Sequence, residues 1–90
     1  MYRIAVVFLL FLASSAAFAL SAKEDGHAWH RASRGEKEAL VKDAMRRIGA
    51  KYPFVEMMAC VDTAFAKPAP EYVLGQQIAT VMAFCHLQLE

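Results

Sequence analysis

This sequence predicts a small all-α fold: a three-helix domain after a cleaved signal peptide, with the last two helices joined by one disulfide. Three observations lead to this prediction. Apolar residues recur at three- and four-residue steps in three segments, which is the period of a helix with one buried face. The first 19 residues have the pattern of an export signal. The remainder of the chain contains two cysteines.

Residues 1–19 are predicted to be a signal peptide. Arg3 precedes an apolar run over residues 4–13, and residues 17–19, Ala-Phe-Ala, fit the small-x-small rule for cleavage. The alternative is an uncleaved anchor, because the apolar stretch over 4–20 approaches the about 20 residues that span a bilayer. The small residues before the cleavage site favour removal. We therefore expect a periplasmic or secreted protein without a stable membrane anchor.

The predicted mature chain, residues 20–90, is short for a domain with its own core. Domains of fewer than about 70–80 residues commonly need an additional covalent or metal constraint. Export would permit a disulfide, and two cysteines allow one intramolecular pairing, Cys60–Cys85. Closing that loop is expected to contribute about 3.5 kcal/mol by the chain-entropy model.

Residues 20–32 show no sustained hydrophobic period, and we expect a flexible N-terminal arm there. Trp29 is the exception, because a lone Trp just before a helix usually packs back onto the core. The helical domain is predicted to span residues 33–90.

The first helix is expected from Ser33 to about Gly49. Ser33 and Glu36 form the pattern of a capping box, in which each side chain bonds the backbone amide of the other. One apolar face follows at helical spacing: Leu40, Val41, Ala44, Met45 and Ile48. Gly49 and Pro53 are stop signals.

The second helix is expected over residues 54–67, with the prolines that follow ending it. Its apolar face consists of Phe54, Met57, Met58, Val61, Ala64 and Phe65, with Cys60 at the edge. If the last helix began at Glu71, Cys85 would lie about 21 Å into it and Cys60 about 10 Å from the end of its own helix. That mismatch exceeds the reach of a disulfide. We therefore expect the last helix to begin effectively near Gly75, or the two helices to cross strongly.

The last segment, residues 71–90, has no charged side chain between Tyr72 and Leu89. Its apolar residues extend nearly all round the helix, and two other helices cannot cover every side of it in so small a protein. Val73, Phe84 and Leu87 lie off its central stripe. We expect these three residues to form a surface for a protein partner or a second copy. The interleaved glutamines and His86 disfavour a transmembrane span.

The predicted mature chain is formally neutral, because nine basic residues balance nine acidic ones after Arg3 is removed. This balance gives no electrostatic support to nucleic-acid binding. The charge is uneven, with +3 over residues 23–51 and −3 over 52–90. We expect the two halves to attract each other within the fold, although a basic partner-binding face is the alternative.

Cys85 and His86 are neighbours, but the pattern does not predict a catalytic pair. Adjacent side chains on a helix diverge by 100° and rarely reach each other, whereas a nucleophilic Cys needs a His within hydrogen-bond distance. No C-x-x-C motif, Gly-rich phosphate loop, nucleophile elbow or metalloprotease motif is present. We therefore expect neither an enzyme nor a cofactor.

His27 and His30 are the candidate metal ligands, because neutral imidazoles bind Cu²⁺ and Zn²⁺ well. A closed zinc site needs four ligands, and the cysteines are expected to bond each other. The leading expectation is thus an exported, non-enzymatic helical protein that binds another protein. The alternative is a periplasmic metal-binding protein that uses these two histidines.

Overall fold

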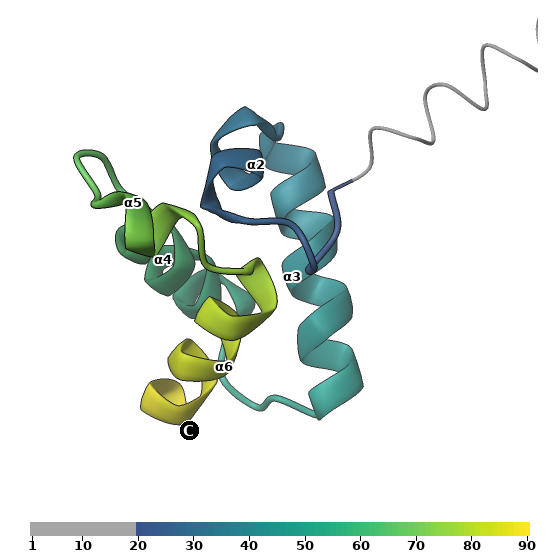
Figure 1. Cartoon of the computed structure of the whole chain (residues 1–90). Coiled ribbons are helices and arrows are strands. Elements are labelled where there is room, and N and C mark those ends of the chain that lie inside the picture. Colours follow the sequence, from purple (N-terminus) through teal and green to yellow (C-terminus); the bar gives the residue numbers. More distant parts are fainter. Residues whose placement is uncertain (1–19) are drawn as a thin grey trace, which may run out of the picture.

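The computed structural model describes residues 20–90, and within this range the chain is all-α, with five helices and no strand (Figure 1). The helices are α2 (Gly26–Arg31), α3 (Arg34–Ile48), α4 (Phe54–Ala64), α5 (Glu71–Leu74) and α6 (Ile78–Leu89). The predicted fold class is confirmed, with α2 and α5 as short additions to the three longer helices. The predicted signal peptide lies outside the described residues. None of the helices described is long and apolar enough to cross a membrane.

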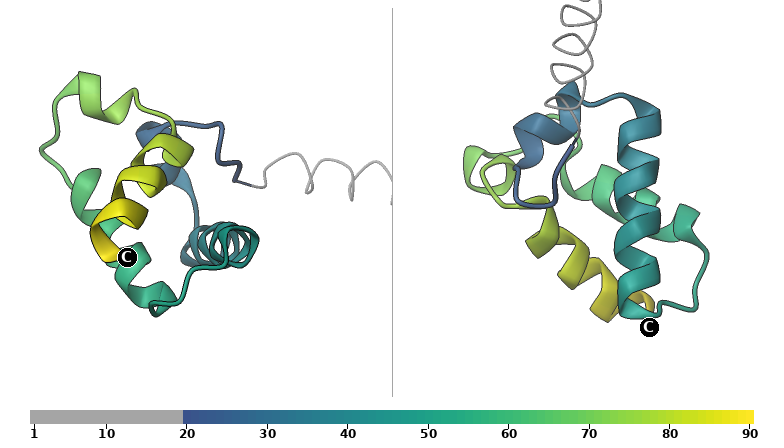
Figure 2. Two further views of the ribbon diagram at one scale, coloured as in Figure 1. Left: turned by 90° about the horizontal axis from the view of Figure 1, so that it is seen from below. Right: turned by 90° about the vertical axis from the view of Figure 1, so that its right-hand side faces the viewer.

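The helix α4 is central, because it packs against both α3 and α6. The helices α3 and α6 are set apart from each other in Figure 1 and in the left view of Figure 2. The core between them is formed by apolar side chains that are almost fully buried: Trp29, Val41, Met57, Met58, Val61, Phe65 and Ile78. The predicted core positions of the first two helices therefore face each other, with Ile48 as the main exception.

The ends of α3 follow the sequence signals. The Ser33 hydroxyl accepts from the Glu36 amide at 3.2 Å, and the Glu36 carboxylate accepts from the Ser33 amide at 3.1 Å. This capping box satisfies two backbone groups that the first helical turn leaves unpaired. Hydrogen bonding of the Glu36 carboxylate to the Ser33 backbone, and to a lesser degree to the Ser33 side chain, lowers the pKa of Glu36 below its ordinary value. At the other end, Gly49 adopts φ of 66°, a left-handed conformation that glycine tolerates well.

The last segment is not one helix, because α5 ends at Leu74 and α6 begins at Ile78. Cys85 therefore lies seven residues into α6, about 10 Å from its start. The Cα atoms of Cys60 and Cys85 are 6.0 Å apart, and the two residues form the predicted disulfide. The last helix thus begins late, as predicted, and α5 lies in the connection that precedes it.

Residues 20–32 differ from the expected flexible arm, because part of this segment is a helix packed on the rest of the fold. The Asp25 carboxylate caps α2 by accepting from the Ala28 amide, and Trp29 is only 1% exposed. Gly26 is buried so closely that a Cβ there would lie 2.5 Å from the Phe65 ring. The expectation that Trp29 packs onto the core is correct.

The same segment completes the start of α6. The backbone amides of Ile78 and Ala79 donate to the carbonyls of Glu24 and Ala22, at 2.8 and 2.9 Å. Gln77 provides no side-chain cap. The first turn of a helix has amide groups without partners inside the helix, so the N-terminal segment supplies the cap that Gln77 lacks.

Candidate interaction surface on α6

The helix α6 carries two apolar stripes on opposite sides. Its inner stripe, Ile78, Val81, Met82 and Cys85, is buried against the rest of the fold. Its outer stripe consists of four exposed residues, Thr80, Ala83, Phe84 and Leu87. At 100° per residue these four span an arc about 100° wide, centred opposite the inner stripe. A second stripe of this kind is typical of a helix that has packing partners on two sides.

Phe84 and Leu87 are the most apolar members of the outer stripe, and they are 61% and 71% exposed. Burying a side chain of this size fully is worth about 1.5–3 kcal/mol. Scattered exposed apolar residues are ordinary on protein surfaces, but a contiguous group marks an interaction site more often. Phe84 and Leu87 are therefore exposed, as predicted. Their role in binding remains a prediction.

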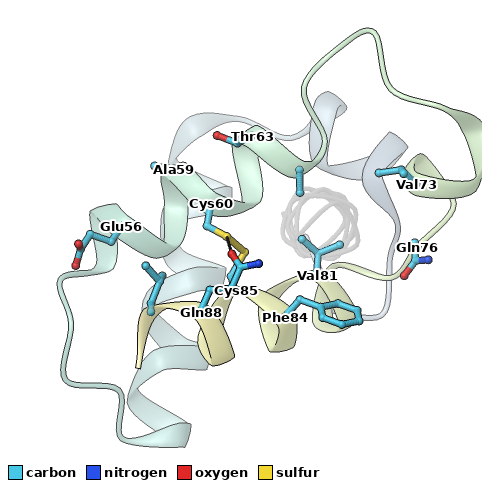
Figure 3. Close-up of a pocket in the computed structure, with 12 residues that line it drawn as sticks. Glu56, Ala59, Cys60, Thr63, Val73, Gln76, Val81, Phe84, Cys85 and Gln88 are labelled. Atoms are coloured by element: carbon cyan, nitrogen blue, oxygen red, sulfur yellow. Dashed lines mark hydrogen bonds between the residues drawn. A yellow bond between two sulfur atoms is a disulfide. The ribbon is translucent and has the colours of Figure 1, made fainter.

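A groove of about 720 Å³ runs along one side of this stripe, between α4 and α6 (Figure 3). Its floor includes the disulfide and Val81, and Phe84 forms part of its edge. Val73, the third predicted surface residue, is half-buried and lines the same groove from α5. The structure thus brings Val73 and Phe84 to one groove, while Leu87 lies toward the opposite edge of the outer stripe and does not line this groove.

A second groove, of about 490 Å³, separates α3 from α6, and Leu87 lines it together with Met57, Met82 and Ile48. The sequence placed Ile48 on the buried face of its helix, but it is 50% exposed. This assignment was wrong because α3 and α6 do not close on each other at this end. Ile48 therefore extends the exposed apolar surface from α6 to the last turn of α3.

Charged side chains occur only at the margins of the two grooves. Glu56 is the charged residue that lines the first groove, and Arg47 is the charged residue that lines the second. The Arg47 Nε atom donates to the Asp43 carboxylate at 2.8 Å, and Asp43 also pairs with Arg46. The surface between these margins is uncharged, which favours an uncharged, apolar partner over an ionic one.

Cys85 and His86 do not act on each other. Cys85 is bonded to Cys60, and the Nδ1 atom of His86 lies 2.6 Å from the hydroxyl of Tyr52. Burial, and to a lesser degree the charge of Glu90, raises the pKa of Tyr52 above its ordinary value of 10.0. Tyr52 therefore stays protonated near neutral pH, and its hydroxyl shares a hydrogen bond with Nδ1. The Nε2 atom of His86 lies 3.2 Å from the Glu90 carboxylate.

His27 and His30, the predicted metal ligands, have different neighbours. The Nε2 atom of His27 lies 2.8 Å from the Glu71 carboxylate, while Nε2 of His30 bonds the carbonyl oxygen of Phe65. Within residues 20–90 no group of three or more His, Cys, Asp or Glu side chains is placed to hold a metal ion. The observed contacts give these two histidines a structural use, as links from α2 to α5 and to the end of α4. Metal binding by this pair remains a prediction.

Two features of the structure were not predicted from the sequence. Asp62 accepts from the indole nitrogen of Trp29 and also lies 3.6 Å from the Arg34 guanidinium. This ion pair joins the basic half of the chain to the acidic half. The other feature is the capping of α6 by the carbonyls of residues 22 and 24. Neither had a local sequence signal, because each joins segments far apart in the chain.

No protein-family model matches this chain, and it matches no curated protein and no solved structure.

Proposed function

We propose that this chain is an exported, non-enzymatic protein that binds another polypeptide through the outer stripe of α6. The observation that carries the proposal is the uncharged, exposed stripe of Thr80, Ala83, Phe84 and Leu87, with an apolar groove on each side. Because α4 already covers the inner stripe, the outer stripe is available to a partner. An apolar surface rimmed by polar groups is the usual composition of a protein contact.

The location outside the cytoplasm is part of the same proposal. The Cys60–Cys85 disulfide supports it, because such bonds persist in oxidising compartments and are rare in reducing ones. The signal-like residues 1–19 support it independently. Mass spectrometry of the protein isolated from its native envelope tests it: we expect a chain that begins at Leu20, and a chain that retains residues 1–19 would contradict cleavage.

Chemical cross-linking followed by capture from the native envelope tests the surface. The variants are Phe84→Lys and Leu87→Lys, and the matched control is Val55→Lys, because Val55 is 57% exposed on α4 and lines neither groove. We expect both α6 variants to lose cross-linked species that the control retains, with circular dichroism unchanged in all three. If both α6 variants keep every species, whether a second copy or another protein, the proposed surface is wrong.

A further inference from the structure

We infer that the outer stripe of α6 takes a second copy of this chain, with the two α6 helices packed antiparallel about a twofold axis. This inference deepens the proposed function and rests on it. It starts from the spacing of the stripe, whose residues Thr80, Ala83, Phe84 and Leu87 follow the i, i+3, i+4, i+7 pattern. That pattern presents one face to another helix.

The order of residue sizes along the stripe identifies the partner. A twofold axis that passes between positions 83 and 84 places Ala83 opposite Phe84 of the second copy. The same axis places Thr80 opposite Leu87. Each large side chain therefore meets a small one, and this occurs twice by symmetry. A twofold contact requires a surface that is complementary to its own rotated image, and this stripe has that property.

A parallel pairing lacks this complementarity. It would place Phe84 against Phe84 and Ala83 against Ala83, so that two bulky rings meet at one level and a gap is left at the next. Closely packed interfaces avoid both overlaps and voids, because each loses dispersion contacts. Antiparallel helices also bring opposite ends of their dipoles together, which is the favourable arrangement. The antiparallel orientation is therefore preferred on shape and on electrostatics.

The lack of charge on the surface agrees with a second copy. The stripe is uncharged, so two copies meet without like-charge repulsion, and each supplies the apolar partner that the other requires. Exposed side chains beside the stripe can enter the grooves of the other copy, as ridges on one helix fit grooves on its neighbour.

Sedimentation of residues 20–90 with the disulfide intact tests the inference through two paired variants. Thr80→Glu with Leu87→Glu places like charges opposite each other in the antiparallel dimer. Thr80→Glu with Leu87→Lys places opposite charges there, and it adds the same number of charged side chains. In a parallel dimer the second variant would instead oppose like charges. Comparing the two double variants thus tests both whether the chain dimerises and whether the two helices are antiparallel.

We expect the native chain to dimerise at micromolar concentrations. The Glu/Glu variant should weaken the dimer by at least tenfold, and the Glu/Lys variant should restore it with a stronger dependence on salt. A native chain that remains monomeric at millimolar concentration would overturn the inference, as would a Glu/Glu variant that dimerises like the native chain. Loss of the dimer in the Glu/Lys variant would overturn the antiparallel orientation.

The outcome also separates this inference from the proposed function. A monomeric native chain, whose capture of a different protein is still lost in Phe84→Lys and kept in Val55→Lys, would reject the second copy and retain the binding surface. If Phe84→Lys and Val55→Lys behave alike in both capture and sedimentation, the second copy and the binding surface are both rejected.

Discussion

The indole Nε1 atom of Trp29 donates to the carboxylate of Asp62 at 2.9 Å, across 33 positions of sequence. This bond joins α2 to α4, and the Trp29 ring is almost completely buried beside Phe65. A buried N–H that loses its acceptor costs about 1–3 kcal/mol. The N-terminal segment is therefore held by a specific polar contact as well as by apolar packing.

Asp62→Ala should reduce the free energy of unfolding by about 1–3 kcal/mol, because the Trp29 indole is left without an acceptor. Glu56→Ala, on an exposed position of the same helix, should change it by less than about 0.5 kcal/mol. Urea unfolding followed by the fluorescence of Trp29, the single Trp of the chain, measures both. Equal stability of the two variants would show that the Trp29–Asp62 bond does not stabilise the fold.

Two glycines should respond in opposite directions to the same substitution. Gly26→Ala would place a Cβ 2.5 Å from the buried Phe65 ring and 3.0 Å from the Leu74 carbonyl. We expect it to destabilise the protein by about 1–3 kcal/mol through overpacking. Gly35→Ala has no neighbour within 4 Å of the new Cβ and lies in α3. It should stabilise by about 0.5–1 kcal/mol, since alanine loses less backbone entropy. Thermal unfolding of both variants measures the contrast, and a Gly26→Ala protein as stable as the native one would contradict the close packing of α2.

The capping box of α3 should make stability depend on pH in the acidic range. Folding lowers the pKa of Glu36 below its ordinary 4.5, so the folded state binds this proton less readily than the unfolded state. The resulting stabilisation is fully present above pH 4.5 and is lost as the pH falls through the lower, folded-state pKa. Unfolding of the native chain and of Glu36→Gln between pH 2 and 7 measures this. The native advantage should shrink toward low pH, and a difference that is constant over the whole range would contradict the role of the carboxylate.

Reduction of the Cys60–Cys85 disulfide should cost about 3.5 kcal/mol, the loop-closure value for 25 residues. Unfolding with and without a reductant measures the loss. A double variant, Cys60→Ala with Cys85→Ala, is the control, because its stability should be low and unaffected by the reductant. A native chain whose stability does not change on complete reduction would show that the disulfide is not a major constraint.

The sequence predicted those parts of the fold whose signals are local. The Ser33–Glu36 box, the stop at Gly49 and the helical spacing of the apolar residues define α3 and α4 within short windows. The disulfide also followed, because two cysteines allow a single pairing. The late start of α6 was predicted from the reach of that disulfide.

The N-terminal segment could not be predicted, because its order comes from partners distant in sequence. The Glu24 carbonyl bonds the Ile78 amide, and Gly26 fits against Phe65, but neither contact has a local pattern. For the candidate surface, the exposure of Phe84 and Leu87 followed from helical spacing and the lack of charge. The two grooves did not follow, because they depend on the separation of α3, α4 and α6. Ile48 shows this clearly, since its periodic position was correct while its burial was not.

Photo-cross-linking from a single position in intact cells tests the proposal that the outer stripe of α6 meets another polypeptide. A photoreactive residue at position 84 is compared with one at position 55, which is similarly exposed on α4 but lines neither groove. We expect a discrete adduct from position 84, with twice the mass of the chain if the partner is a second copy, and none from position 55. No adduct from position 84, or the same adducts from both positions, would contradict the claim.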